Sequence, residues 1–145
     1  MRVVVDSNIL LASVLPDEPL TTEAQKLLSM WTSAQTRLVA PRLFRYELVA
    51  VVRKAVFQKR ITYAEGLPLL ERLLAYPIDL YDEDALMTHA FEIASRFNMP
   101  RTYDAQYVAL ADRFNCECWT ADKALYNVIQ PQFSGIRWLG HFAAP

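Results

Sequence analysis

Two aspartates stand where short apolar runs of the chain end. Asp6 directly follows the β-branched run Val3-Val4-Val5, and Asp122 follows a second run that ends at Thr120. A continuous β-branched run is typical of a strand buried on both faces of a parallel sheet. In open α/β sheets, ligands bind outside the carboxyl ends of the strands. The positions of Asp6 and Asp122 therefore predict that both carboxylates lie at a ligand-binding edge.

Two further acids complete a candidate set. Glu47 lies inside an expected helix with apolar neighbours one turn on, so a carboxylate on that side would be partly buried. Asp104 begins another expected helix, where the helix dipole favours a negative charge. Carboxylates brought within a few ångströms repel, and some take up protons unless a cation compensates. Mg²⁺ and Mn²⁺ prefer oxygen ligands, and such a site can activate water for attack on a phosphodiester.

Each of these acids also has a local structural explanation. Asp6, Asp104 and Asp122 each stand at an expected helix start and could cap it. Glu47 could instead pair with an arginine of its own helix. Taken singly, the four positions leave both interpretations open, whereas four acids at such positions together favour a metal site.

The elements that must position these acids alternate between short strands and longer helices. Strands are expected at 3–5, 37–40, 78–81, 117–120 and 136–139, and helices at 8–15, 21–34, 43–59, 62–76, 83–97 and 104–114, with a helical turn at 123–126. This alternation predicts an α/β fold, a three-layer sandwich with a short central parallel sheet flanked by helices. The chain has no repeat and no linker, so residues 1–145 are expected to form one domain.

Composition agrees with a globular protein. The chain is 53% hydrophobic and 21% charged, and its three glycines predict few loops and many helices. No apolar run reaches the roughly 18 residues that a membrane-spanning helix needs. Asp6 interrupts the stretch where a signal peptide would continue, so a cytoplasmic protein without membrane contact is expected.

The two cysteines, Cys116 and Cys118, are expected on one face of a strand as small core residues. A zinc site is the alternative, but it would need more ligands, and His89 and His141 are far away in sequence.

Basic residues are concentrated in one segment. Residues 42–60 hold six Lys or Arg and one acid, a charge of +5, so that a chain of net charge −1 leaves −6 elsewhere. A basic helix suits contact with phosphates, and a solvated helix face explains the same pattern equally well.

Four segments, taken in order, resemble the acidic motifs of PIN domains. They are Val3-Val4-Val5-Asp6-Ser7-Asn8, Glu47-Leu48, Tyr103-Asp104-Ala105-Gln106-Tyr107-Val108-Ala109-Leu110-Ala111 and Trp119-Thr120-Ala121-Asp122-Lys123-Ala124-Leu125. The resemblance spans nearly the whole chain and is greatest to the small VapC-type toxin ribonucleases. No single motif is specific, but the four in order form a strong signal.

The resemblance implies a parallel sheet flanked by helices and an endoribonuclease that uses Mg²⁺ or Mn²⁺. It implies that Asp6, Glu47, Asp104 and Asp122 coordinate one or two cations and are the catalytic residues. Water would attack the phosphorus and leave a 5′-phosphate and a 3′-hydroxyl. Supporting roles fall to the polar residues Asn8, Thr120 and Ser7, which would orient the aspartates or a water, or would cap helices instead.

The resemblance also implies partners. Arg42 and Arg45, within two turns of Glu47, are expected to bind RNA phosphates, and a cognate antitoxin and a homodimer are expected. The apolar segment Leu67–Leu74 could supply the dimer interface, although core packing is the favoured interpretation. Lys123 stands where some PIN domains carry a further acid, which puts a second cation in doubt.

Other classes fit less well. A catalytically inactive PIN-like module that binds RNA or protein is the main alternative. A phosphatase for small phosphoesters would want a D-x-D nucleophile or a glycine-rich loop, and position 8 is Asn8. A receiver domain would want two adjacent acids after the first strand and a phosphoacceptor after the third, where Asp82 is a poor candidate.

Overall fold

The central element of the molecule is a five-stranded parallel sheet. In this computed structural model, which describes residues 1–143, the strands follow the order β3-β2-β1-β4-β5 and each neighbouring pair is parallel. The strands are β1 (Arg2–Val5), β2 (Arg37–Pro41), β3 (Asp79–Tyr81), β4 (Glu117–Thr120) and β5 (Ile136–Trp138). The predicted parallel sheet is confirmed.

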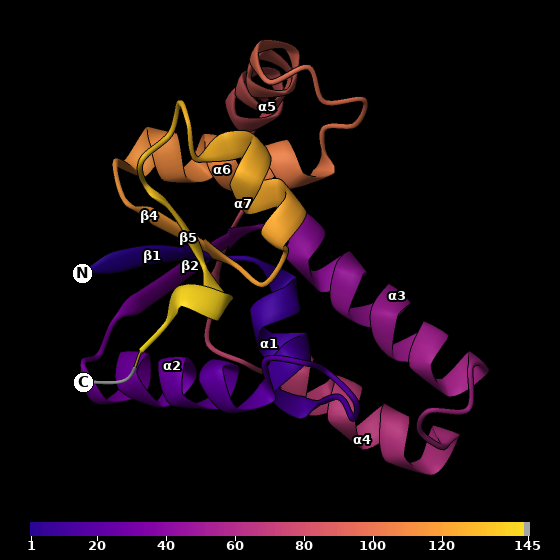
Figure 1. Cartoon of the computed structure of the whole chain (residues 1–145). Helices are drawn as coiled ribbons and strands as arrows, with labels where there is room; N and C mark the ends of the chain where they lie inside the picture. Colours follow the sequence, from indigo (N-terminus) through magenta and orange to yellow (C-terminus); the bar gives the residue numbers. More distant parts are fainter. Residues whose placement is uncertain (144–145) are drawn as a thin grey trace.

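Helices cover both faces of this sheet. They are α1 (Ser7–Val14), α2 (Thr21–Ser33), α3 (Leu43–Phe57), α4 (Tyr63–Leu74), α5 (Asp84–Arg96), α6 (Tyr103–Phe114) and α7 (Lys123–Ile129), followed by the 3-10 turn η1 (Leu139–His141). In Figure 1, α5, α6 and α7 lie above the sheet, α1 and α2 lie below it, and α3 and α4 extend to the right as a pair. This is the predicted three-layer sandwich.

The sheet and α6 form the centre of the core. The valines of β1 are buried, because β1 lies in the middle of the sheet between β2 and β4 and α6 packs against it. Helix α6 packs against the sheet through Tyr107 and the fully buried run 108–111, and α5 packs on its outer side. Small alanines in that run let the helix approach the strands closely, which holds the start of α6 at a fixed place beside the sheet.

Several expected boundaries differ from the structure. Helix α6 begins at Tyr103, one residue earlier than predicted, and α7 runs to Ile129 instead of ending near 126. The side chains of Leu125 and Ile129, one turn apart, are both buried and continue α7 along the core. The last turn of α7 was not predicted because the spacing of Leu125 and Ile129 is the only helical pattern in this short segment.

The cysteine prediction is wrong in part. Cys118 is fully buried in β4, but Cys116 lies before the strand and is only half-buried. Its backbone N–H bonds to Ala111 O, and Asn115 adopts a left-handed conformation (φ 48°), so that these residues close the end of α6. Both thiols are free.

The segment Leu67–Leu74 divides between core and surface. Thr62 and Glu65 form a capping box that starts α4, and Leu69 and Leu73 are buried, whereas Leu67 is exposed. The favoured interpretation of this segment as core is confirmed for the two buried leucines. In the part of the chain that the structure describes, no helix combines the length and apolar character needed to span a membrane.

Candidate functional site

The carboxyl ends of the two central strands bring the predicted acids together. Asp6 follows β1 and Asp122 follows shortly after β4, and the backbone N–H of Asp6 donates to Trp119 O at 3.0 Å. Helices α1, α3 and α7 start at this edge, on the right of the sheet in Figure 1. The sheet topology therefore places the ends of two strands and the starts of three helices around one region.

Asp6 is buried at the base of this region, with only 3% of its surface exposed. Its Oδ2 accepts hydrogen bonds from Thr120 Oγ1 at 2.9 Å and from Asn8 Nδ2 at 3.2 Å, and its Oδ1 accepts from the Asn8 backbone N–H. Burial, with the negative charges of Glu47 and Asp104, raises the pKa of Asp6 to about 8 against the opposing effect of these donors. Asp6 therefore caps α1 and also carries a strongly perturbed carboxyl.

Asn8 and Thr120 join the two strand ends. Asn8 Nδ2 donates to Thr120 Oγ1 at 3.1 Å, and Asn8 Oδ1 accepts from the Ala121 N–H at 2.8 Å. Thr120 Oγ1 also accepts from the Asp122 N–H at 3.1 Å. These bonds fix the distance between the segments that carry Asp6 and Asp122, as expected of residues that orient the two acids.

Replacing Thr120 by valine should test this connection. Thr120→Val keeps the shape of the side chain but removes the donor to Asp6 and the acceptor for Asp122 N–H in a fully buried place. We expect a loss of about 1–3 kcal/mol in the free energy of unfolding, measured by urea denaturation. Thr88→Val, which removes an exposed hydroxyl that bonds within α5, is the control and should change stability little. An unchanged urea midpoint for Thr120→Val would contradict a structural role of this hydroxyl.

Glu47 reaches the site from the first part of α3. Its Oε1 accepts hydrogen bonds from Ser7 Oγ at 3.2 Å and from Tyr107 Oη. Burial raises the pKa of Glu47, and the charge of Asp104 acts in the same direction, while both hydroxyl donors lower it. Within residues 1–143 Glu47 makes no ion pair, so the alternative of an arginine partner on its own helix is wrong.

Tyr107 is the site residue for which the sequence analysis gave no role. It is fully buried in α6, and its hydroxyl donates across to Glu47 of α3. A signal was present, because Tyr107 lies three residues after Asp104 and residues at this spacing share a helix face.

Asp104 is not the cap of its helix. The N-cap position of α6 belongs to Thr102, and Asp104, second in the helix and half-buried, has no side-chain hydrogen bond among the described residues. Burial and the charge of Asp122 raise the pKa of Asp104. Its carboxylate therefore faces other acids without a donor to balance it.

Asp122 does cap a helix. Its Oδ1 accepts from the backbone N–H groups of Ala124 at 2.9 Å and Leu125 at 3.2 Å, at the start of α7. The capping interpretation of Asp122 is thus confirmed, as it is for Asp6. Capping does not remove these carboxylates from the site, because each has a second oxygen and each lies at the same edge.

Three of the acids line one cavity. A volume of about 600 Å³ lies between the start of α6, the α5–α6 loop and α7, and Glu47, Asp104 and Asp122 all contribute to its wall. The acids also influence one another through their charges. The charge of Asp104 helps to raise the pKa values of Asp6 and Glu47, and the charge of Asp122 helps to raise the pKa of Asp104. Such mutual repulsion is the condition that a bound cation relieves.

The donor set fits an open cation site and not a closed one. Among the described residues, no three Asp, Glu, His or Cys side chains converge into a ready-made metal cage. Mg²⁺ demands no such cage, since it keeps several waters and is usually held by one or two carboxylates together with substrate phosphates. Four carboxylates at one edge, three of them with raised pKa values, have the chemistry of that kind of site.

Arg42 and Arg45 do not lie with the acids. Arg42 Nε pairs with Asp82 at 3.3 Å, beyond the end of β3, and both side chains are half-exposed. Arg45 Nη1 donates to Leu74 O at 3.2 Å, at the end of α4. Sequence proximity to Glu47 was misleading because residues two or five apart point to different sides of a helix.

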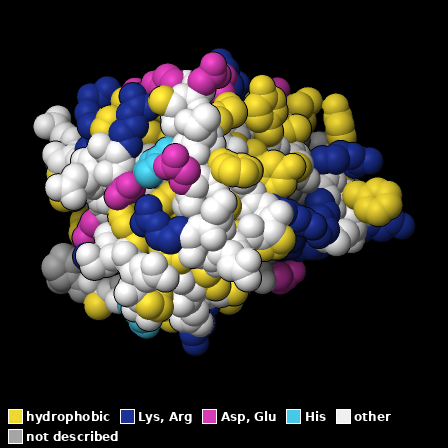
Figure 2. Space-filling model, turned by 90° about the horizontal axis from the view of Figure 1, so that it is seen from above, with side chains coloured by type: hydrophobic (Ala, Val, Ile, Leu, Met, Phe, Trp, Pro, Cys, Tyr) yellow, Lys and Arg dark blue, Asp and Glu magenta, His cyan; other side chains and the backbone are white. Residues whose placement is uncertain are grey.

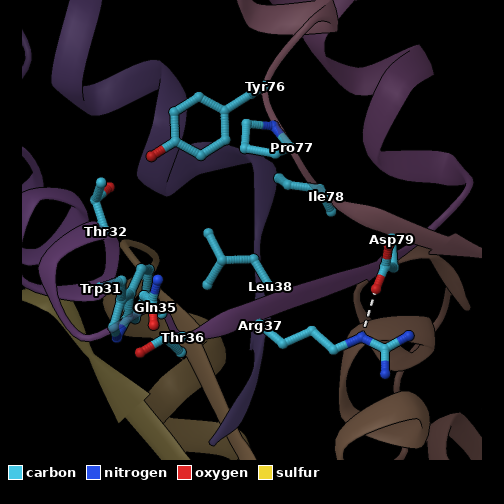
Figure 3. Close-up of a pocket in the computed structure, with 10 residues that line it drawn as sticks. All are labelled: Trp31, Thr32, Gln35, Thr36, Arg37, Leu38, Tyr76, Pro77, Ile78 and Asp79. Atoms are coloured by element: carbon cyan, nitrogen blue, oxygen red, sulfur yellow. Dashed lines mark hydrogen bonds and ion pairs between the residues drawn. The ribbon is translucent and has the colours of Figure 1, made fainter.

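A second cavity, of about 480 Å³, lies elsewhere. Figure 3 shows its lining, with Arg37 and Asp79, which begin β2 and β3, joined by an ion pair, and with Trp31 from α2 and Tyr76 nearby. Because Arg37 and Asp79 stand at the amino ends of their strands, this cavity lies at the opposite end of the sheet from the carboxylates. Asp79 is the one acid among the described residues that line it, so it is not the candidate site.

Comparison with known proteins agrees with this geometry. A family model described as PIN domain matches residues 4–129. A VapC ribonuclease of Mycobacterium bovis and the ribonuclease VapC9 of Mycobacterium tuberculosis are each 31% identical to the chain over 130 residues, which is 90% of this chain and 93% of each relative.

Solved structures share the fold. PAE2754 from Pyrobaculum aerophilum has a TM-score of 0.68 at 18% identity, with 97% of this chain and 93% of that chain covered. A chain of VapBC2 from Rickettsia felis, bound to a promoter DNA fragment, has a TM-score of 0.65 at 13% identity, with 89% and 94% covered. The family-model match and the sequence relatives show that the chain belongs to the PIN-domain family and groups within it with the VapC proteins.

Proposed function

We propose that this chain is a Mg²⁺- or Mn²⁺-dependent endoribonuclease and the toxin of a toxin–antitoxin pair. The observation that carries the proposal is the group of four carboxylates at the carboxyl ends of β1 and β4, with raised pKa values for Asp6, Glu47 and Asp104. The names of the 31%-identical relatives, which are ribonucleases, support the same reaction.

The acids Asp6, Glu47, Asp104 and Asp122 would hold the cation. When bound, Mg²⁺ or Mn²⁺ supplies activation of water and neutralisation of charge on the phosphodiester. Asn8 and Thr120 keep Asp6 at its place, and Ser7 and Tyr107 keep Glu47 at its place through their hydroxyl groups. The four acids would hold one or two cations, and Lys123, not a further acid, follows Asp122.

The reaction is hydrolysis at a bridging oxygen of RNA. Water adds to phosphorus, the P–O3′ bond breaks, and O3′ leaves with its electron pair and takes up a proton. Asp104 is suited to accept a proton from the water, because its carboxylate has no side-chain hydrogen bond among residues 1–143 and its raised pKa makes it more basic. The products are a 5′-phosphate and a 3′-hydroxyl.

Arg42 and Arg45 remain proposed contacts for more distant RNA phosphates. The pair of Arg42 with Asp82 is half-exposed, and such pairs contribute little to stability, so a phosphate can replace the carboxylate. They would extend the binding surface along α3 and away from the acids.

The direct test incubates purified protein with a mixed pool of RNA in Mg²⁺, in Mn²⁺ and in EDTA. We expect cleavage with either cation and none in EDTA, with fragments that a 5′-phosphate-dependent exonuclease degrades. Failure of both cations, with intact secondary structure by circular dichroism, would favour an inactive RNA- or protein-binding module.

An antitoxin and a second copy of the chain are the proposed partners. The structural neighbours include VapBC-1 from nontypeable Haemophilus influenzae, with a TM-score of 0.63 at 16% identity and with 97% of this chain and 99% of that chain covered. An antitoxin partner is proposed because of this similarity. Exposed apolar side chains favour a homodimer through α3 or α5: Tyr46 and Val49 lie on α3, and Met87 and Phe91 lie on α5. Seen from above, hydrophobic side chains gather on the right half of the face, with Lys and Arg beside them (Figure 2).

Phe91 offers a test of the homodimer. Its side chain is 67% exposed on α5, so Phe91→Asp should not disturb the core. We expect the wild-type chain to have twice its monomer mass in light scattering coupled to size exclusion, and Phe91→Asp to have the monomer mass at the same concentration. If Leu67→Asp on α4 dissociates the dimer and Phe91→Asp does not, the interface lies on the Leu67–Leu74 segment instead.

A further inference from the structure

The cavity beside the carboxylates has a second wall, which is formed by residues other than the acids. The α5–α6 loop, residues 97–101, and the first residue of α6 form this wall, and α7 adds Ala124, Leu125 and Val128. In Figure 1 this loop connects α5 to the start of α6 on the side where the strands end. It therefore lies next to the place where the phosphodiester must sit if the acids hold a cation.

Tyr103 is the aromatic side chain at the start of α6. It directly precedes Asp104, lines the same cavity, and is 56% exposed. It takes no part in the aromatic pairs found within residues 1–143, and no hydrogen bond of its hydroxyl is present there. An aromatic ring left open beside a phosphate site offers a flat surface on which a nucleobase can stack.

Among residues 1–143, Arg101 is the one basic residue in the lining of this cavity. It is exposed and forms no ion pair with the acids of the described chain, whereas Arg37, Arg42 and Arg113 are all paired. Beside three carboxylates, an unpaired guanidinium supplies the positive charge that a second phosphate of a nucleic acid needs.

The remaining wall is apolar. Met99 and Pro100 of the loop and Val128 of α7, the last with 48% of its surface exposed, line the same cavity as Tyr103 and give it hydrophobic surface. An apolar wall with an exposed aromatic ring and one cation matches the alternation of base and phosphate along a single strand. A base within a duplex is stacked on both faces and cannot reach a ring inside a cavity.

We propose that Tyr103 and Arg101 form a subsite for one unpaired nucleotide of RNA next to the bond that is cleaved. The base stacks on Tyr103, between the α5–α6 loop and Val128, and a neighbouring phosphate binds Arg101. This inference rests on the proposed ribonuclease function and adds how the strand is held and why it must be unpaired. The alternative occupant of the cavity is an apolar side chain of a peptide, whose binding would not depend on the charge of Arg101.

The test measures binding without cleavage. Fluorescence anisotropy of a short unstructured RNA with Mg²⁺ is recorded in the Asp6→Asn background, and the same variants are assayed for cleavage with Asp6 intact. Tyr103→Ala should raise Kd about 5- to 100-fold, the range expected for loss of one base–aromatic stack. Tyr103→Phe and Tyr103→Trp should stay within about threefold of the parent, since each keeps a stacking ring.

Arg101 gives a second, independent readout. Arg101→Ala should raise Kd and reduce the dependence of log Kd on log salt concentration by about one phosphate contact, and Arg101→Lys should restore the salt dependence. The matched controls are Tyr63→Ala and Arg72→Ala on α4, exposed residues outside the cavity, which should leave both quantities unchanged. A perfectly paired RNA duplex should bind Tyr103→Ala and its parent equally.

The outcomes separate this inference from the proposed function. If wild-type protein cleaves RNA and Tyr103→Ala neither weakens binding nor raises KM, the subsite is wrong and the ribonuclease stands. If RNA is not cleaved but binds in a manner that depends on Tyr103 and Arg101, the subsite stands and the catalytic proposal is wrong. If RNA neither binds nor is cleaved, both are overturned.

Discussion

Asp104→Asn is expected to lower RNA cleavage by at least about 100-fold, because loss of even an outer partner of a metal ligand costs 10- to 100-fold. The substitution keeps the shape of the side chain but removes the charge that would hold a cation or accept a proton. Asp104 makes no side-chain hydrogen bond in the described chain, so the fold loses no hydrogen bond by the change. Cleavage of a fluorescent RNA at saturating Mn²⁺ and the melting temperature are the two measurements.

Asp84→Asn is the matched control. Asp84 is also an acid in the first turn of a helix, α5, but it is exposed and does not line the cavity. It should cleave RNA at the wild-type rate. Equal activity of Asp104→Asn and Asp84→Asn would show that Asp104 serves the helix dipole alone and would remove it from the catalytic group.

The sequence predicted a residue's position correctly where that position depends only on the strand or helix that carries the residue. Asp6 and Asp122 were placed correctly because a parallel sheet brings the carboxyl ends of its strands to one edge, and an apolar run shows where a strand ends. The sheet itself was predictable for the same reason, since only a strand covered on both faces tolerates three valines in succession.

Contacts between elements that are distant in the sequence were not predictable in this way. Tyr107 bonds to Glu47 across sixty positions, and that pairing depends on how α3 and α6 pack on the sheet. The same reason explains Arg42 and Arg45, whose partners come from the residue after β3 and from α4. It also explains Arg101, which lines the cavity because of the course of the α5–α6 loop. Local helix spacing cannot reveal which neighbouring element a long side chain meets.

A fall in melting temperature with rising pH is the second large effect expected, in protein freed of metal by EDTA. The pKa of Asp6 is about 8 in the folded chain against an ordinary 3.8, so the folded state holds this proton more tightly than the unfolded state. The protonated Asp6 therefore stabilises the folded state. This contribution to the free energy of unfolding is complete below the ordinary pKa of 3.8 and is lost as pH rises through the folded-state pKa. Glu47 and Asp104, whose pKa values are also raised, act with the same sign.

The groups that face Asp6 reinforce this direction. Glu47 and Asp104 repel its charge. Burial raises the pKa values of Tyr107 and Cys118, and the charge of Asp6 acts on both in the same direction. Scanning fluorimetry between about pH 5 and about pH 8 should show a decrease of at least about 5 °C, given a shift of roughly 4 °C per kcal/mol for a chain of this length. Asp6→Asn removes the buried charge and should flatten most of the profile.

A bound cation should balance the negative charge that the carboxylates carry once they have lost their protons. Adding Mg²⁺ or Mn²⁺ is expected to raise the melting temperature more at pH 8 than at pH 5, because protons compete with metal for the same carboxylates. Asp6→Asn should lose most of this increase, whereas Asp84→Asn on α5 should keep it. A melting temperature that responds to neither pH nor metal would mean that local caps and hydrogen bonds already balance the acids, and the cluster would then be structural. A response to pH without a response to metal would separate the perturbed carboxyl of Asp6 from any role in holding a cation.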